Sequence, residues 1–403
     1  MGCGGRAVTA VPGGAVAGRR WPSAAGAWLG IGAAPGALVL GAQVAERHDG
    51  VLPLLVLLAG GVLMAALLAG QGLLGLLPPL GENSTLSVAS ARYLPPVADR
   101  AVALSMTLAM IGWFGFNVGL GGAALGALTG LPDWAAAVAL AAPLLGVIVV
   151  GGGRWNGLAI VATGSAIVLI GLVALRTLPE GLPVTVQPAG PRSTAVDLAG
   201  FLGYVSVFAM RAPDFTVGLR RRRDLAWCVG LLVVPALLAA VVGAGLSAAT
   251  GSSDVVATLA GPQGMAAANL FLAVAVVAPT LACVHSGSLA LGRLAPLPAR
   301  LLPWLVAVPG LVLAILRVDR LMADWLVLLA AAVPALVVPM VVEAARRRRG
   351  RPPRLISTWT WLPPSAIAVA GTVAGYPESA LVGLVLSVLA ALLAQWRPRA
   401  PAR

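Results

Sequence analysis

The segment 30–36 reads GIGAAPG and stands in the middle of an apolar stretch, 24–45. Proline lacks a backbone N–H and glycine tolerates conformations closed to other residues, so a helix is expected to unwind here. A second unwound point is expected in the apolar stretch 195–218, around Gly200 and Gly203. The two stretches are five apolar segments apart, and an odd offset inverts the second half of a chain relative to the first. The pattern predicts an inverted repeat.

The composition places the chain in a lipid bilayer. Of its 403 residues, 59% are hydrophobic and 10% are charged, and the mean hydropathy is +0.95. Soluble domains contain about 25% charged residues, so they are excluded. A barrel is excluded too, because its strands alternate apolar and polar residues. A spanning helix needs about 20 apolar residues. The sequence offers twelve such segments: 24–45, 51–78, 101–130, 133–152, 155–177, 195–218, 225–249, 264–290, 301–318, 321–343, 358–376 and 379–396.

The arginines give this all-α polytopic protein its orientation. All 27 basic residues are arginine, and 22 of them fall on one side of the predicted bilayer. The positive-inside rule makes that side cytoplasmic, with both termini, and predicts a plasma-membrane protein. The net charge of +13 therefore reflects topology, and no nucleic-acid partner is expected. The predicted parts are a tail at 1–23, a ten-helix core at 24–343, an Arg-rich cytoplasmic loop at 344–357, and two extra helices with a tail at 358–403.

The fourteen carboxylates lie in predicted loops or near helix ends. A carrier driven by protons commonly keeps one in mid-membrane. Their placement argues against a carboxylate relay and leaves coupling through backbone and hydroxyl oxygen atoms. No organic cofactor is expected.

The third apolar segment carries a candidate ligand site. Residues 111–117 read IGWFGFN, so Trp113 and Asn117 lie one helical turn apart on one face. An indole ring stacks on a flat heterocycle, and a carboxamide both donates and accepts hydrogen bonds. The alternative is a packing tryptophan beside a polar contact between helices.

The eighth segment carries the histidine of the predicted spans, His285. An ionisable group within a membrane is a functional candidate, and the alternative is a neutral imidazole bonded to a neighbouring helix. Nearby, Thr280 either offers its hydroxyl oxygen to a cation or bonds back to its own helix.

The sequence resembles the nucleobase–cation symporters, the group of cytosine permeases and of allantoin and hydantoin transporters. The similarity is concentrated at residues 112–115 (GWFG) and at 203–216, and it extends over about 25–355, where the tenth segment runs into the arginines 346–349. The resemblance implies a five-plus-five inverted-repeat core of the leucine-transporter type plus two C-terminal helices. It also implies alternating access and coupling to Na⁺ or H⁺.

The resemblance also implies a substrate site. Trp113 takes the position of the stacking platform, Asn117 that of a substrate-binding amide, and His285 that of an asparagine in some members. In the sixth segment Val205 replaces an aromatic residue, so its neighbours Tyr204 and Ser206 are the expected contacts.

The implied ion site departs from the family pattern. Thr280 matches a hydroxyl position used for sodium, but Pro279 replaces the preceding hydroxyl and Leu281 an asparagine. The ion would be held by the Thr280 hydroxyl and by backbone carbonyls near the first break and in the eighth segment; the break residues concerned are Gly32, Ala33 and Gly36. Weak sodium affinity or proton coupling is therefore expected.

These features together predict an importer of a nucleobase or similar small planar heterocycle, such as cytosine or a hydroxymethylpyrimidine, and not an enzyme. Two other classes stay open: a membrane sensor or scaffold built on a carrier fold, and a membrane-embedded transferase. Uptake of the ligand would distinguish a carrier from a sensor.

Overall fold

The computed structural model describes residues 18–150, 155–179, 181–187, 190–261 and 265–396. Within them the chain is an all-α polytopic membrane protein, as predicted. The ends at 1–17 and 397–403, which the arginine pattern assigns to the cytoplasm, lie outside the described residues.

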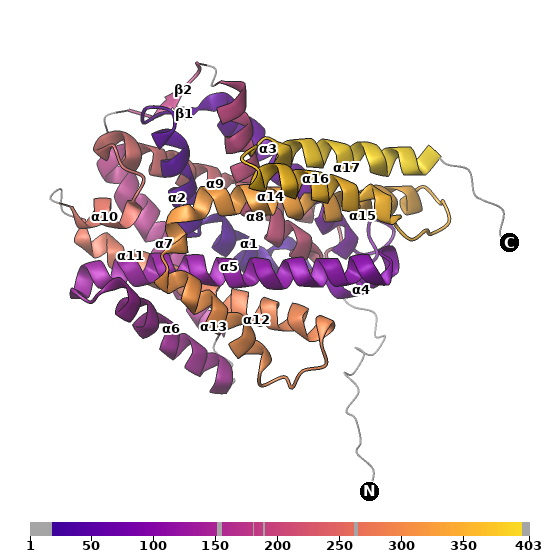
Figure 1. Ribbon diagram of the computed structural model, residues 1–403, viewed down its shortest axis with the longest axis horizontal. Helices are drawn as coiled ribbons and strands as arrows, with labels where there is room; N and C mark the ends of the chain where they lie inside the picture. Colours follow the sequence, from indigo (N-terminus) through magenta and orange to yellow (C-terminus); the bar gives the residue numbers. More distant parts are fainter. Residues whose placement is uncertain (1–17, 151–154, 180, 188–189, 262–264, 397–403) are drawn as a thin grey trace, which may run out of the picture.

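Each predicted apolar segment coincides with one helix or with two consecutive helices (Figure 1). The first half comprises α1 (Ala25–Gly32), α2 (Pro35–Glu46), α3 (Leu54–Gly72), α5 (Pro96–Thr129), α6 (Asp133–Val150) and α7 (Trp155–Thr177). The second half comprises α8 (Pro191–Thr216), α9 (Arg222–Thr250), α11 (Ala266–Ala275), α12 (Val277–Leu294), α13 (Leu302–Ile315), α14 (Met322–Ala332) and α15 (Pro334–Arg348). The additional pair is α16 (Leu362–Val373) and α17 (Ser379–Trp396).

In the described part of the chain, eight helical segments are long and apolar enough to cross a bilayer. The other four predicted spans are shorter helices. Three of them, α6, α13 and α17, are apolar over 10–17 residues, and α16 has 12 residues.

Several short elements in the connections were not predicted. A helix, α4 (Leu86–Tyr93), precedes α5, and α10 (Val255–Ala260) follows α9. Two-residue strands, β1 (Leu52–Pro53) and β2 (Val184–Thr185), pair in parallel. Single turns of 3₁₀ helix are η1 (Trp21–Ser23), η2 (Leu73–Gly75), η3 (Val318–Leu321) and η4 (Thr358–Thr360).

The helix contacts follow an inverted repeat. The first span packs against the seventh through α2 and α9, and the second packs against the sixth through α3 and α8. The first and sixth spans correspond in the repeat, as do the second and seventh. Exchanging each span for its counterpart therefore turns one contact into the other. The third and eighth spans, which are also five apart, meet through α5 and α12. The additional helices lie along one side of this core, where α16 contacts α14 and α17 contacts α15 (Figure 1).

The predicted break in the first span is present. Helix α1 ends at Gly32 and α2 begins at Pro35, and Ala34 between them is extended, with φ −61° and ψ 143°. Proline disfavours the helical conformation in the residue before it, which explains the extended Ala34. The break therefore falls at 33–34, within the predicted 30–36.

The second predicted break is wrong, because α8 is continuous through 200–206. Its glycines allow close packing instead. A Cβ atom at Gly203 would overlap the carbonyl oxygen of Leu326 in α14, and one at Gly200 would lie 3.2 Å from Leu40 in α2. Two breaks occur elsewhere: α14 gives way to α15 at Pro334, and α11 to α12 at Val276.

Connections that were predicted to lie on the same side of the bilayer contact one another. At one end of the bundle, the Arg19 amide donates to the Gly218 carbonyl at 2.7 Å, and Arg348 donates to the Leu80 carbonyl. These segments were all predicted to be cytoplasmic. Segments predicted to be external meet one another in the same way, as in the 2.5 Å ion pair of Arg47 and Asp197.

The loop in the Arg-rich segment is shorter than predicted. The sequence places a loop at 344–357, but α15 continues to Arg348. Arg346 is only 4% exposed, and it donates to the Glu343 carboxylate at 2.6 and 2.7 Å. Arg347 donates to the same carboxylate at 3.0 Å. These ion pairs one turn apart extend the helix, so both side chains bind protein rather than lipid headgroups.

The packing of α8 on α14 predicts a specific sensitivity. We expect Gly203→Ala to lower the stability of the purified protein by about 1–3 kcal/mol, because the added methyl group would force the two helices apart. Thermal unfolding in detergent micelles measures the change. Gly164→Ala is the matched control, since a Cβ at Gly164 of α7 meets open space. Equal midpoints for the two variants would contradict the close contact.

Candidate functional site

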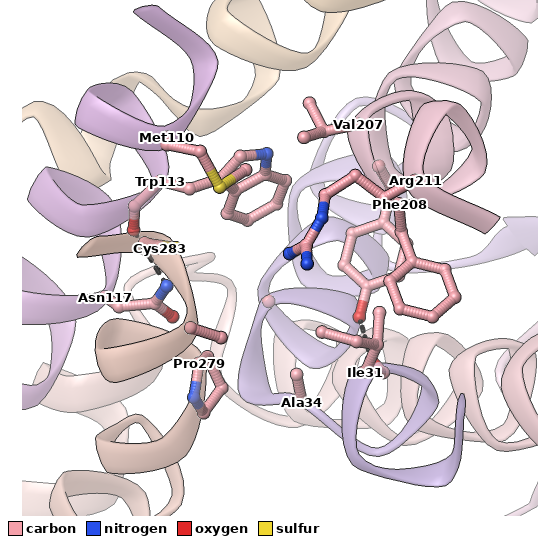
Figure 2. Close-up of a pocket in the computed structure, with 13 residues that line it drawn as sticks. Ile31, Ala34, Met110, Trp113, Asn117, Val207, Phe208, Arg211, Pro279 and Cys283 are labelled. Carbon is pink, nitrogen blue, oxygen red and sulfur yellow. Dashed lines mark hydrogen bonds between the residues drawn. The ribbon is translucent and has the colours of Figure 1, made fainter. Parts of the chain in front are cut away.

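A cavity of about 80 Å³ lies beside the break in the first span, where four parts of the bundle meet (Figure 2). Such a volume holds several water molecules or a small ring. Its wall is mostly apolar, with a few polar groups, as is usual for small-molecule sites. The wall consists of Ile31, Ala34 and Gly36 at the break, Met110, Trp113 and Asn117 of α5, Tyr204, Val207, Phe208 and Arg211 of α8, and Pro279, Ala282 and Cys283 of α12.

The broken helix brings main-chain atoms into this wall. Pro35 cannot donate a helical hydrogen bond, so α1 terminates and leaves carbonyl groups at its end. The Tyr204 hydroxyl donates to the Ile31 carbonyl at 2.7 Å. A side chain of α8 thereby bonds the last turn of α1, and Tyr204 connects the two spans that the sequence pairs.

Trp113 projects into the cavity from α5 (Figure 2). Its ring meets those of Tyr204 and Phe116 nearly edge to face, with centroid distances of 6.0 and 5.5 Å and interplanar angles of 77° and 87°. These contacts fix the indole in one orientation, since edge-to-face aromatic pairs are favourable. The arrangement supplies a held, half-buried aromatic surface.

Asn117 lies one turn along the same face and is buried. Its Nδ2 donates to the Trp113 carbonyl at 2.7 Å. This bond orients the amide and uses one of its two N–H groups. The amide also interacts with the Cys283 thiol, and its oxygen atom is an acceptor for a ligand. The sequence thus predicted two neighbouring wall residues, Trp113 and Asn117, and the structure brings Tyr204 to them.

Ser206 does not line the cavity, contrary to expectation. The residues of α8 that do are spaced as one helical face, from Tyr204 to Val207, Phe208 and Arg211. Ser206 points away from that face, and its hydroxyl donates to the Leu202 carbonyl at 2.7 Å within α8. Its role is internal to the helix.

His285 does not line the cavity either. Its neighbours Ala282 and Cys283 do, and a rotation of about 100° per residue turns His285 away from that face. The residue is exposed, and it interacts electrostatically with Arg211.

The four residues expected to hold an ion surround the end of α1 without forming one wall. Gly36 faces the cavity. Gly32 contacts the backbone of α9 at Leu232, and Ala33 packs with Ala166 and Ala275. Thr280 is fully buried and donates to the Val276 carbonyl at 2.6 Å.

Arg211 also lines the cavity, although it was not among the predicted site residues. Its spacing of seven from Tyr204 places it on the same face of α8. The guanidinium group extends into the cavity, between α8 and Trp113 (Figure 2). It donates to the Ser286 hydroxyl, and its Nε lies 3.5 Å from the Asp214 carboxylate.

A second cavity, of about 230 Å³, adjoins the first. The two share Ile31, Phe208, Arg211, Pro279 and Ala282 as wall residues. The second cavity extends along α1 and α7 to Gly26 and Leu158, near the ends of those helices that were predicted to be cytoplasmic. At the opposite end of the bundle, Arg317 binds both Asp133 of α6 and Asp319 of η3. The site is therefore bordered by space toward the predicted inner face.

Comparison with known proteins supports the fold. No family model and no curated protein sequence matches the chain. Among solved structures, the inward-facing conformation of Mhp1 superimposes with a TM-score of 0.71, 16% identity, and coverage of 96% of this chain and 95% of that one. A closed conformation of Mhp1, a nucleobase-cation-symport-1 family transporter, with bromovinylhydantoin bound gives 0.68, 18%, 93% and 91%. A Na⁺-coupled sialic acid symporter gives 0.62, 14%, 93% and 90%. The chain has the fold of these transporters.

The bond between Tyr204 and Ile31 yields a prediction. We expect Tyr204→Phe to destabilise the protein by about 1 kcal/mol, because the variant loses one buried hydrogen bond without changing the ring. The thermal unfolding midpoint in detergent reports the loss. Tyr376→Phe is the control, because Tyr376 is exposed between α16 and α17. A midpoint equal to that of the control would show that the hydroxyl does not hold the break.

Proposed function

We propose that the protein is a secondary transporter that imports a nucleobase or similar small planar heterocycle, such as cytosine or a hydroxymethylpyrimidine, by alternating access coupled to a cation. The observation that carries the proposal is the position of Trp113 and Asn117 in one cavity wall, beside a broken helix, in a fold shared with transporters. Broken helices at a cavity are where such proteins bind their cargo.

The wall suits a flat ring. The Trp113 ring offers a face for stacking, held by its edge-to-face contacts, and the Asn117 amide oxygen offers an acceptor one turn away. The surrounding side chains, including Met110, Val207 and Phe208, exclude water from the faces of a bound ring. An aromatic heterocycle with polar groups on its edge uses both parts of this wall.

The end of α1 supports cation coupling. Pro279 has no N–H, so it cannot donate the helical hydrogen bond to the carbonyl of Ala275 four residues earlier. Ala275 packs against Ala33, next to the carbonyl end of α1, where the helix dipole is negative. Pro279, which stands where related transporters have a hydroxyl residue, thus leaves the carbonyl oxygen of Ala275 without its helical donor. Oxygen atoms at a helix end suit Na⁺, and Thr280 supplies a hydroxyl on the following turn.

The arrangement of cavities fits an importer in its inward-facing state. The space beside the ligand cavity leads along α1 and α7, whereas Arg317 ties α6 to the turn after α13 at the other end. We place the protein in the plasma membrane with both termini in the cytoplasm, since the arginine-rich connections gather at the end toward which this space leads.

Binding experiments on Trp113 test the proposal. Stacking on an aromatic ring contributes about 1–3 kcal/mol, and each 1.4 kcal/mol is tenfold in affinity, so Trp113→Ala should weaken binding roughly tenfold to a hundredfold. Trp113→Phe should retain part of the affinity. The measurement is uptake and equilibrium binding of a radiolabelled nucleobase panel in a host without its own permeases.

Trp134→Ala provides the control, because Trp134 is exposed at the start of α6. Unchanged binding in folded Trp113→Ala protein would refute the stacking site. Binding without uptake would show a sensor rather than a carrier.

A second experiment tests the coupling ion. In proteoliposomes, we expect an inward Na⁺ gradient to drive uptake of the best substrate of that panel with a low affinity for Na⁺, because Pro279 replaces one hydroxyl ligand. Thr280→Ala should raise the Na⁺ concentration for half-maximal uptake about tenfold, as expected for a lost ligand oxygen worth about 1.4 kcal/mol. Thr280→Ser should preserve it.

Thr107→Ala is the matched control, since Thr107 is also buried and also donates to a carbonyl four residues earlier, that of Ala103. Uptake driven by a pH gradient and indifferent to Na⁺ would assign coupling to protons instead.

A further inference from the structure

We propose that the cargo carries an anionic group, such as a carboxylate on the ring, and that Arg211 binds it. The proposal rests on the function proposed above and narrows the class of heterocycle. It starts from the charge inside the cavity, which neither stacking on Trp113 nor hydrogen bonding to Asn117 uses.

Arg211 occupies an unusual place for a charged side chain. It belongs to the face of α8 that lines both cavities, and its side chain is only 17% exposed. Charged groups within a membrane protein are costly unless they are paired, and they mark ligand or ion pathways. Its position alongside Trp113 and Tyr204 therefore indicates that a group of opposite charge pairs with it.

The partners of Arg211 within the protein are incomplete. Nη1 donates to the neutral Ser286 hydroxyl, and the guanidinium carbon lies 5.0 Å from the centre of the Phe215 ring. The one carboxylate near it is Asp214, 3.5 Å from Nε, which is longer than a good charge-assisted hydrogen bond.

Asp214 is also engaged elsewhere. Its other oxygen accepts the Leu86 backbone N–H at 2.7 Å, and its side chain is 27% exposed. Neither contact of Arg211 with Ser286 or Asp214 involves Nη2. The planar group therefore keeps donor capacity on the side that faces the cavity (Figure 2).

The rest of the wall favours an anion. Arg211 is the sole charged residue among the described residues that line the two cavities. Gly36, in the wall, belongs to the first turn of α2, whose N–H groups give that helix end a positive potential. Positive groups thus approach the cavity from α2 and from α8.

The geometry suits one molecule that satisfies both kinds of contact. A ring stacked on Trp113 would direct a substituent toward α8, where the guanidinium can donate to a carboxylate. Hydrogen bonds to charged groups contribute about 1.5–3 kcal/mol, which corresponds to about 10-fold to 150-fold in affinity. Recognition of the charged group then adds to stacking rather than replacing it.

A matched pair of probes tests the inference: uracil, which is neutral, and uracil-6-carboxylate, which is an anion with the same ring. Cyclohexanecarboxylate serves as a non-planar anion. Binding to the full-length protein in detergent is measured for wild type, Arg211→Gln, Arg211→Lys and Arg100→Gln. Arg100 is exposed on α5 outside the cavity, so its variant controls for the loss of one positive charge.

We expect wild type and Arg100→Gln to bind the carboxylate at least tenfold more tightly than uracil. Arg211→Gln should abolish this preference, and Arg211→Lys should keep part of it. The wild-type comparison requires no variant, so a poorly folded Arg211→Gln protein leaves the proposal testable.

Each of the other outcomes refutes a specific part of the two proposals. Tighter binding of uracil refutes the anionic cargo and leaves the planar-heterocycle function standing. A carboxylate preference that survives in Arg211→Gln refutes the role of Arg211. Binding of cyclohexanecarboxylate that depends on Arg211 but not on Trp113 keeps the anion and refutes the planar cargo. No binding of any probe refutes both proposals.

Discussion

The structure depends on which groups form hydrogen bonds with the main chain at the break in the first span. Within a bilayer no water is available for unpaired N–H and C=O groups, so an unwound segment survives only if other parts of the protein bind it. Here Pro35 removes one donor, and the Tyr204 hydroxyl bonds the carbonyl of Ile31. Because Tyr204 also meets the ring of Trp113 edge to face, the contact that stabilises the break sets the orientation of the aromatic surface beside it.

The sequence predicted those parts of the protein that local chemistry decides. Pro35 removes a backbone donor and disfavours the helical conformation at Ala34, so the break at this point follows from local chemistry. The spacing of Trp113 and Asn117 puts them on one face of any helix. The predictions that were wrong failed for a different reason. Glycine at 203 is compatible with a break and with close packing, and only the neighbouring backbone of α14 decides between them. The side-chain directions of Ser206, His285 and Arg211 follow from the rotation of α8 and α12 in the bundle, which hydropathy does not reveal.

At the end of the bundle that was predicted to be cytoplasmic, the arginines also form contacts that hold the structure together. Glu343 receives hydrogen bonds from Arg346, Arg347 and the Arg354 backbone, and Arg347 also lies 3.8 Å from the centre of the Tyr93 ring. Burial and a hydrogen bond to Glu82 raise the pKa of the Tyr93 phenol, so it stays a neutral donor. The arginines that orient the chain during insertion thus connect α4, α15 and the segment leading to α16.

The contact of α2 with α9 has a consequence for evolution. At Gly41 and Gly243 each helix meets the main chain of the other, at Ala240 and Leu38, with no room for a side chain. A contact between two backbones has no side-chain rotamers that could rearrange. A displacement of one helix therefore displaces the other by the same amount. None of these four residues lines the cavity, so this joint is separate from the cavity wall. Exchanges in the wall can therefore alter which molecule binds there without changing the contact between α2 and α9.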